Sequence, residues 1–148
     1  MVSNKYLDPS LQKAFMPTVP GCTEHHLKLS SALAEAHSNH KSLVVCWLDL
    51  ANAYGSVHHS LINFSLKHYH APPKFLYIVQ ALYSELNAKV ITTEWETPDI
   101  PIQKGVYQGD PLSVVIFNTV MNTLLDTVSL RIDLGYQFSS SSRRVNIL

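Results

Sequence analysis

The clearest feature of the hydrophobic pattern is one continuous apolar run, Ser42–Leu48, which is rich in the β-branched and aromatic residues typical of strands. An apolar run without alternation indicates a strand covered on both faces, so we expect it to be central in its sheet. The run ends at Asp49, which places a carboxylate at the end of a buried strand. The pattern therefore predicts a central strand with an acid directly after it.

Four other segments repeat apolar residues every three or four positions, which is the spacing of an amphipathic helix. They are His25–His37 (preceded by Thr23 and Glu24), Ser56–Tyr69, Phe75–Leu86 and Leu112–Val128. The last has the strongest start signal, because Asp110 stands at the N-cap position and Pro111 at the first helical position. We therefore expect four helices, the last with an apolar stripe wide enough to pack on a sheet.

The remaining segments predict shorter elements. Ala88–Thr93 and Trp95–Gln103 have the pattern of two strands, the second interrupted by a turn signal at Thr97–Asp99. Residues 1–22 are interrupted by prolines and a glycine, so we expect an extended lead-in before the first helix. Arg143–Leu148 looks like the beginning of another strand.

Length and composition fit about one globular domain. The chain has 148 residues, of which 46% are hydrophobic, enough to fill a core. Eleven basic residues balance eleven acidic ones, so no overall charge draws the chain to nucleic acid or to a membrane. No continuous apolar run reaches the roughly 18 residues of a membrane helix, and the N-terminus lacks the apolar stretch of a secretory signal. We therefore expect a soluble, intracellular protein without membrane contact, in either nucleus or cytoplasm.

Two places in the chain combine features that suit a metal ion and a nucleotide. Asp49 follows the predicted strand, and a loop bounded by Gly105 and Gly109 precedes the last helix. Mg²⁺ prefers carboxylate oxygens, and a glycine loop lets a base or sugar approach the backbone closely. Taken alone, Asp49 could be an ordinary helix cap and the loop a plain turn. Together they indicate a site that holds a metal ion and a nucleotide phosphate.

These residues resemble the reverse transcriptase domain of non-LTR (LINE-like) retrotransposons. Trp47–Val57 is similar to the first palm motif of that family, and Gly105–Ser113 is similar to its second; we call them the first and second motif. A weaker similarity, from Gln12 to His25, matches the segment that leads from the fingers into the palm. The resemblance covers roughly Leu11 to Leu148. It implies an extended lead-in over residues 1–22 and a partial palm domain over residues 23–148.

The resemblance also implies roles for single residues. Asp49 matches the catalytic, metal-binding carboxylate of the first motif, and the backbone carbonyl of Leu50 would be a second metal ligand. Tyr54 matches the aromatic gate beneath the incoming deoxyribose, although it could instead be a core aromatic. Gln108 and Gly109 match the pair that contacts the incoming nucleotide and the template base. The implied cofactor is Mg²⁺, and the implied partners are an RNA template, a DNA primer and a dNTP; the resemblance says nothing of oligomeric state.

The chain departs from the family pattern at two points. Many relatives carry an acid where this chain has Gly55, a position that does not bind the metals. The third palm motif, an aromatic residue followed by any residue and Asp-Asp, is absent from the 148 residues. Two-metal nucleotidyl transfer needs carboxylates that hold a pair of ions about 3.5 to 4 Å apart, so we expect this chain to be inactive alone.

The resulting expectation is an α+β fold: a partial polymerase palm with a little of the fingers, in which an antiparallel sheet led by Ser42–Leu48 packs against helices and is incomplete at its C-terminus. The leading function is a fragment of an RNA-directed DNA polymerase. The alternative is a non-catalytic module that keeps the palm as a scaffold for RNA or protein binding. Neither the histidines near His58 and His68 nor the scattered lysines and arginines form a pattern typical of a zinc or phosphate site.

Overall fold

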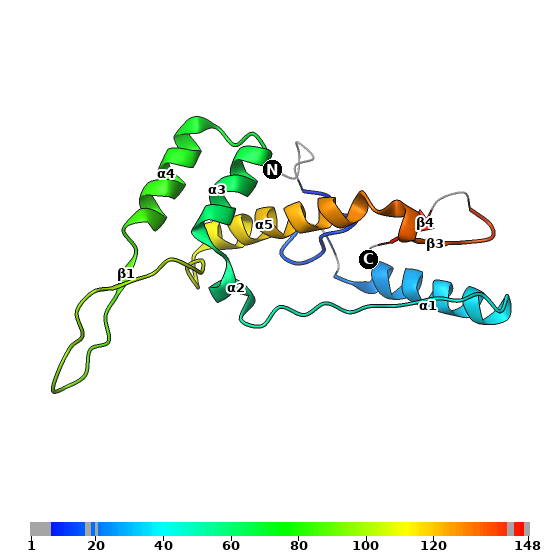
Figure 1. Cartoon of the computed structure of the whole chain (residues 1–148), viewed down its shortest axis with the longest axis horizontal. Helices are drawn as coiled ribbons and strands as arrows, with labels where there is room; N and C mark the ends of the chain where they lie inside the picture. The colour runs from blue at the N-terminus through cyan, green and yellow to red at the C-terminus, as the bar shows by residue number, and fades with distance from the viewer. Residues whose placement is uncertain (1–6, 17–18, 20, 142–143, 147–148) are drawn as a thin grey trace. The chain divides into compact units, whose positions relative to one another are not determined.

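The computed structural model describes residues 7–16, 19, 21–141 and 144–146. It combines helices with short antiparallel strands, so the α+β class is confirmed. In chain order the elements (Figure 1) are α1 (Thr23–Ser38), α2 (Ala53–Ser56), α3 (His59–His68), α4 (Pro73–Ser84), β1 (Asn87–Ala88), β2 (Ile100–Pro101), α5 (Pro111–Ser129), the 3₁₀ helix η1 (Ile132–Leu134), β3 (Tyr136–Gln137) and β4 (Arg144–Val145).

The chain divides into two compact units, each of which is described by itself. Unit 1 comprises Met1–Asp49 and Met121–Leu148, and unit 2 comprises Leu50–Val120. The first ten residues of α5 belong to unit 2 and the remainder to unit 1. The predicted division at residue 22, between lead-in and palm, is not tested by these units and stays a prediction.

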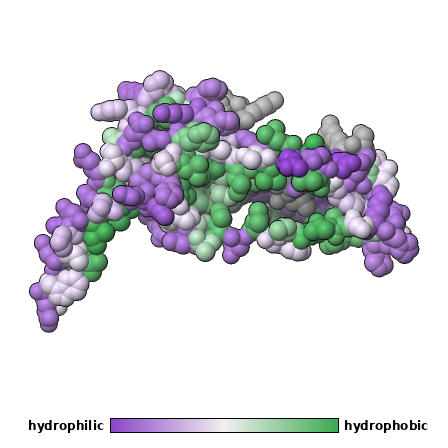
Figure 2. Space-filling view, in the orientation of Figure 1, coloured by the Kyte–Doolittle hydropathy of each residue, from purple (hydrophilic) through white to green (hydrophobic). Residues whose placement is uncertain are grey.

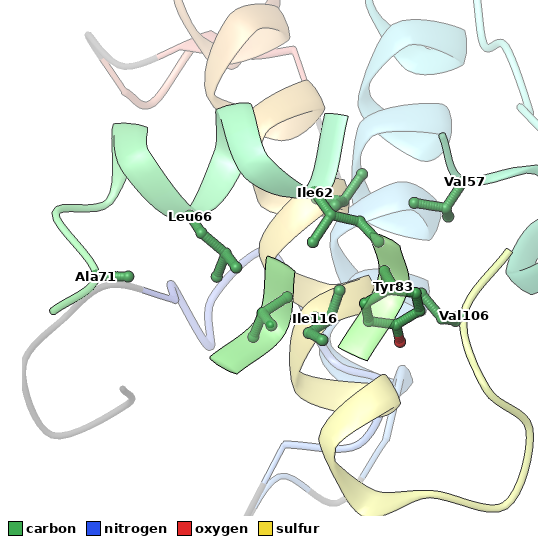
Figure 3. Packing of buried hydrophobic residues seen from close by; sticks show 9 residues of the cluster. Val57, Ile62, Leu66, Ala71, Tyr83, Val106 and Ile116 are labelled. Carbon is green, nitrogen blue, oxygen red and sulfur yellow. The ribbon is translucent and has the colours of Figure 1, made fainter. Parts of the chain in front are cut away.

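Unit 2 is built around α3, α4 and the first part of α5. The helices α3 and α4 pack on each other (Figure 1), and Pro73 occupies the first turn of α4, where its missing N–H costs nothing. Apolar side chains from all three helices and three flanking segments form one core (Figure 3). Its members are Val57, Ile62, Leu66, Ala71, Val79, Tyr83, Val106, Ile116 and Val120. Full burial of each large aliphatic member contributes about 1.5–3 kcal/mol.

The second predicted helix begins three residues later than its apolar spacing indicates. Val57 and His58 are extended, and α3 starts only at His59. The reason is a competing pairing: His58 forms an antiparallel bridge with Lys104, and the Val57 carbonyl accepts the Gly105 N–H at 2.7 Å. Backbone groups committed to this pairing cannot also close helical turns.

The two predicted strands after α4 are confirmed in outline but are shorter than expected. Asn87 pairs with Pro101 and Ala88 with Ile100, while Ile91 and Glu96 form a separate bridge nearer the tip. The Thr92 hydroxyl accepts the backbone N–H groups of Glu94 and Trp95 and so stabilises the turn. This hairpin extends beyond the helices of its unit (Figure 1).

The predicted central strand is wrong. Residues 41–50 have no regular secondary structure, and Val44, Trp47 and Leu48 are 91%, 76% and 81% exposed. A strand exists only where a second strand satisfies its backbone groups. Among the described residues none pairs with 42–48: the strands form two separate two-stranded ladders, β1–β2 and β3–β4. Hydrophobic side chains therefore remain on the surface, and several are visible in Figure 2.

Unit 1 contains α1 and the β3–β4 ladder. The first predicted helix is confirmed by α1, which buries Ala32 and Ala36. In the ladder, Tyr136 pairs with Val145 and Gln137 with Arg144. The strand predicted at Arg143–Leu148 is confirmed at Arg144–Val145, while residues 143, 147 and 148 lie outside the described residues, as do several residues of the lead-in.

Among the described residues one helix, α5, is long and apolar enough to cross a membrane: it has 19 residues and a mean hydropathy of 1.3. Length and composition alone are weak evidence, because core helices of globular proteins have the same properties. Ile116 and Val120 of this helix lie in the core of unit 2, and Asn118 and Thr119 are buried polar residues. That the chain makes no membrane contact stays a prediction.

Candidate nucleotide site

The C-terminal half of the first motif forms a tight turn at the start of unit 2. Asn52 has a left-handed backbone (φ +50°) and precedes α2, and its carbonyl accepts the Ser56 N–H at 2.9 Å. Asparagine tolerates this conformation better than most residues. The turn directs the chain from Leu50 into the extended pair Val57–His58, which contacts the second motif.

Backbone hydrogen bonds tie the two motifs together within unit 2. The Val106 N–H donates to the Tyr54 carbonyl at 3.0 Å, and the Gly105 N–H donates to the Val57 carbonyl at 2.7 Å. Two residues after Val57, Nε2 of His59 lies 3.1 Å from the Gly105 carbonyl oxygen, and the ring N–H donates to that oxygen. Three hydrogen bonds thus fix residues 105–106 against residues 54–59.

Gly105 allows this close approach. Its φ is +96°, and a Cβ placed on it would lie 3.3 Å from the Gly55 Cα and 3.4 Å from the Gly55 carbonyl oxygen. Any side chain at position 105 would be strained by the backbone angle and would press on the opposite backbone. Glycine is therefore required at position 105 for two reasons: the positive φ angle and the close approach of the Gly55 backbone.

Tyr54 is half-buried beside the same loop. Its ring stacks on Phe117 of α5, with ring centroids 4.5 Å apart and planes inclined by 10°. It also packs against the core cluster of unit 2. The alternative that Tyr54 is a core aromatic therefore has structural support, and its role as a sugar gate stays a prediction. Stacking on Phe117 fixes the plane of the Tyr54 ring, and both a core aromatic and a sugar gate need a fixed ring plane.

Gln108 and Gly109 form an exposed turn directly before α5. Gly109 has φ +90°, and no atom of the described residues lies within 4 Å of the position a Cβ would take, so on their side the space beside it is open to a ligand. Asp110 then caps the helix as predicted, because its Oδ1 accepts the Leu112 N–H at 3.0 Å. The turn therefore presents a polar side chain and an unobstructed backbone at the start of a helix.

Asp49 and Leu50 lie where the two units meet in the sequence. Asp49 is exposed, ends the segment 41–49 of unit 1 and forms no hydrogen bond or ion pair with the described residues. The prediction that Asp49 ends a buried strand is wrong, because no described strand pairs with residues 42–48. Leu50, the first residue of unit 2, is 46% exposed. That Asp49 and the Gln108–Gly109 turn share one cleft stays a prediction.

The residues at hand supply part of a magnesium site. The Asp49 carboxylate and the Leu50 carbonyl are hard oxygen donors, the kind Mg²⁺ prefers. Within the described part of the chain no three His, Cys, Asp or Glu side chains gather into a metal-binding group. The Asp49 carboxylate and the Leu50 carbonyl therefore fit as two ligands of a magnesium ion, and a two-ion centre needs further carboxylates.

Sequence reasoning missed two residues of this region. Phe117, which stacks on Tyr54, lies in the apolar stripe of α5 and carries no signal that separates it from other core residues. His59 is one of eight histidines, and its spacing indicated no metal site. Its hydrogen bond to Gly105 joins residues 46 positions apart, which no local pattern encodes.

Comparison with known proteins shows whether the chain only resembles a protein family or belongs to it. The family model described as "Reverse transcriptase (RNA-dependent DNA polymerase)" matches residues 2–142. The chain belongs to the reverse transcriptase family. Among curated proteins, it is 33% identical over 117 residues, or 79% of its length, to the "Retrovirus-related Pol polyprotein from type-2 retrotransposable element R2DM" of Drosophila melanogaster.

Similar R2 element polyproteins occur in other insects. The one from Nasonia vitripennis is 33% identical over 77% of this chain, and the one from Bradysia coprophila is 31% identical over 72%. These matches place the reverse transcriptase domain in the non-LTR class. The chain spans 11% of the length of the Drosophila and Nasonia relatives. Mixed helices and small antiparallel ladders agree with a partial palm and fingers.

Proposed function

We propose that this chain supplies the nucleotide side of an RNA-directed DNA polymerase that copies an RNA template by two-metal nucleotidyl transfer. The observation that carries the proposal is the pairing of the two motifs: residues 54–59 and 103–106 are joined by backbone hydrogen bonds and by His59. The pairing holds Tyr54 and the start of the Gln108–Gly109 loop in one part of unit 2. Membership of the reverse transcriptase family supports the same reaction class.

Each site residue has a role in this proposal. Gln108 and the Gly109 backbone contact the incoming dNTP and the template base, and Tyr54 lies beneath the sugar. Asp49, with the Leu50 carbonyl, is the catalytic carboxylate that holds Mg²⁺ when the metal is bound. The bound metal would neutralise phosphate charge and activate the primer hydroxyl. The partners are then an RNA template, a DNA primer and a dNTP.

The proposal includes a statement about the 148-residue chain itself: alone, it does not extend a primer. It contains the first-motif acid but no Asp-Asp pair, and no three His, Cys, Asp or Glu side chains of the described residues gather into a metal-binding group. The direct measurement is primer extension on an RNA template with Mg²⁺ and all dNTPs. We expect no product above a no-protein control. Template-dependent synthesis by the purified chain would contradict this part of the proposal.

Nucleotide binding tests the remaining part. We expect the chain to bind a dNTP on a primer–template duplex, measured by calorimetry, and Gln108→Ala to weaken that binding about fivefold, as for one lost hydrogen bond of about 1 kcal/mol. Gln137→Ala is the matched control, because Gln137 is an exposed glutamine in β3, outside the motifs. Equal affinities for the two variants would remove Gln108 from the site.

Salt dependence separates polymerase-type binding from a retained scaffold. Contacts to several phosphates release counterions, so the affinity for the duplex must fall steeply as salt rises. An affinity that does not change with salt would favour the alternative of a protein-binding module.

A further inference from the structure

Tyr107 lies in the second motif, directly before the Gln108–Gly109 turn. Backbone hydrogen bonds to the first motif fix the chain as far as Val106. Within the described part of the chain, the N–H groups of Tyr107, Gln108 and Gly109 donate no hydrogen bond. The chain is fixed again at Asp110, whose carboxylate caps α5. The residues proposed to meet the nucleotide therefore lie in a short stretch that backbone donors leave untied.

A contact between two aromatic rings reaches this stretch. The centroids of the Tyr107 and Tyr83 rings are 5.6 Å apart, and their planes are inclined by 40°. The separation lies within the range of about 4.5–7 Å in which aromatic pairs attract each other. Tyr107 is 36% exposed and Tyr83 is 4% exposed, so a ring at the surface lies against a ring of the core.

Tyr83 can hold Tyr107 because its own position is fixed. It lies in α4 and is a member of the core of unit 2 (Figure 3). The ring of His59, in α3, lies 4.9 Å from the Tyr83 ring. The backbone N–H of His59 donates to the Gln103 carbonyl at 3.4 Å, and its ring N–H donates to the Gly105 carbonyl. The rings of His59, Tyr83 and Tyr107, which we call the aromatic cluster, thus join α3 and α4 to the second motif.

The order of the turn before binding affects how tightly it can bind. A loop that is already held in its bound conformation loses less conformational entropy when the ligand arrives. Gly109 has more backbone freedom than any residue with a Cβ, so the turn would change conformation readily without a contact that holds it. The ring contact of Tyr107 is placed one residue before Gln108, where it restricts this freedom.

We propose that Tyr107 and Tyr83 are positioning residues for the incoming nucleotide. Their ring contact holds the Gln108–Gly109 turn in the conformation that meets the dNTP, and His59 supports the Tyr83 ring. Neither tyrosine is assigned a contact with the nucleotide itself. The identity of the ligand rests on the proposed function, whereas the hold on the turn does not depend on it.

A positioning role and a purely structural role differ in what a substitution changes. A purely structural contact contributes to the stability of the fold and leaves both the mobility of the turn and the affinity for the nucleotide unchanged. A positioning contact changes the mobility and the affinity, and any side chain that supplies the ring restores both.

The first measurement needs no ligand. Backbone amide relaxation measured by NMR on the complete chain gives the order parameters of Gln108 and Gly109. Tyr107→Leu removes the ring and keeps an apolar side chain, so these order parameters should fall toward the value of about 0.6 that marks a flexible backbone. Tyr107→Phe should restore the values of the parent chain. Tyr77→Leu is the matched control, because Tyr77 is 72% exposed on α4 and lies outside the aromatic cluster.

The second measurement is the affinity for a dNTP on a primer–template duplex, determined by calorimetry. Tyr107→Leu should weaken binding about fivefold, the factor that corresponds to one aromatic pair, and the loss should appear in the binding entropy. Tyr107→Phe and Tyr77→Leu should bind as the parent chain does. Tyr83→Leu removes the same contact from its other side and should cause the same loss, with no further loss in the double variant with Tyr107→Leu.

Three results would overturn the proposal. The first is an unchanged mobility of the turn in Tyr107→Leu. The second is a turn as mobile in Tyr107→Phe as in Tyr107→Leu, which would show that the hydroxyl and not the ring is needed. The third is additive losses of affinity in the double variant. Because Tyr83 lies in the core, Tyr83→Leu could unfold the chain; the mobility and affinity of the Tyr107 variants, at the exposed end of the contact, then decide.

The two measurements also separate this proposal from the proposed function. A turn that loosens in Tyr107→Leu, in a chain that binds no dNTP, would confirm the ring contact as the hold on the turn and refute the proposed function. Binding of dNTP that Gln108→Ala weakens and Tyr107→Leu leaves unchanged would refute the positioning role and leave the proposed function intact.

Discussion

Replacement of Gly105 by alanine should lower the stability of unit 2. The loss should be larger than for the same change at Gly109, where an added Cβ has open space. The backbone of Gly105 has φ +96°, a conformation that costs a residue with a Cβ about 1–3 kcal/mol. The added Cβ would also lie 3.3 Å from the Gly55 Cα and 3.5 Å from the Tyr54 carbonyl oxygen. The loop cannot move away freely, because Gly105 donates to Val57 and accepts from His59.

Gly109→Ala separates the cost of the positive φ angle from the cost of the contact between the added Cβ and Gly55. Gly109 lies in the same unit with φ +90°, but its added Cβ would have no atom of the described part of the chain within 4 Å. Both variants therefore have a similar backbone cost, and only Gly105→Ala adds the contact with Gly55. Chemical denaturation at equilibrium should show Gly105→Ala less stable than Gly109→Ala, with a total loss of about 2–4 kcal/mol relative to the parent chain. Equal losses for the two variants would refute the inference that close approach of the motifs requires glycine.

Three further variants test other features of the fold. Asp110→Ala should lose about 0.5–2 kcal/mol of stability in denaturation experiments, because the Leu112 N–H loses its cap; an unchanged stability would show that the cap is not formed in solution. Ile116→Ala should lose about 2–5 kcal/mol, since Ile116 is fully buried in the core, and a loss near zero would contradict that placement. The pKa of Glu35 is lowered chiefly by the hydrogen bond from the Ser139 N–H, so this carboxylate stabilises unit 1 above its unfolded pKa and the effect disappears as the pH falls through the folded pKa. Glu35→Gln should therefore melt lower than the parent chain at neutral pH and equally at strongly acidic pH, and a gap independent of pH would refute the assignment.

The helices could be predicted because their signals are local. Apolar spacing identified the segments that became α1, α4 and α5, and the Asp110–Pro111 pair marked the start of α5 within a residue. Each such signal lies within one turn or one face of the helix it predicts. The largest displacement of a helix start, three residues at α3, occurs where a distant segment pairs with Val57 and His58.

The segment Ser42–Leu48 shows the opposite case. Its residues favour a strand, but a strand is a property of two segments, and the second is not specified by the apolar pattern of the first. The described residues contain no partner for it, and the segment has no regular secondary structure. The candidate site has the same limit: the motifs indicated Tyr54, Gln108 and Gly109, but not the hydrogen bonds that join the two motifs.

Gly55 shows how one departure from the family pattern fits its surroundings. Many reverse transcriptases have an acid at this position. In this chain a Cβ at Gly55 would collide with the Asn52 side-chain amide, whose Oδ1 would be 2.6 Å away, and a Cβ at Gly105 would lie 3.3 Å from the Gly55 Cα. An acid at position 55 would therefore require the flexible Asn52 side chain to turn away, and Gly105 would have to tolerate any backbone shift that followed. A Cβ at position 55 would meet Asn52 and a Cβ at position 105 would meet the backbone of Tyr54 and Gly55, so substitutions at the two glycines are expected to disturb the same turn.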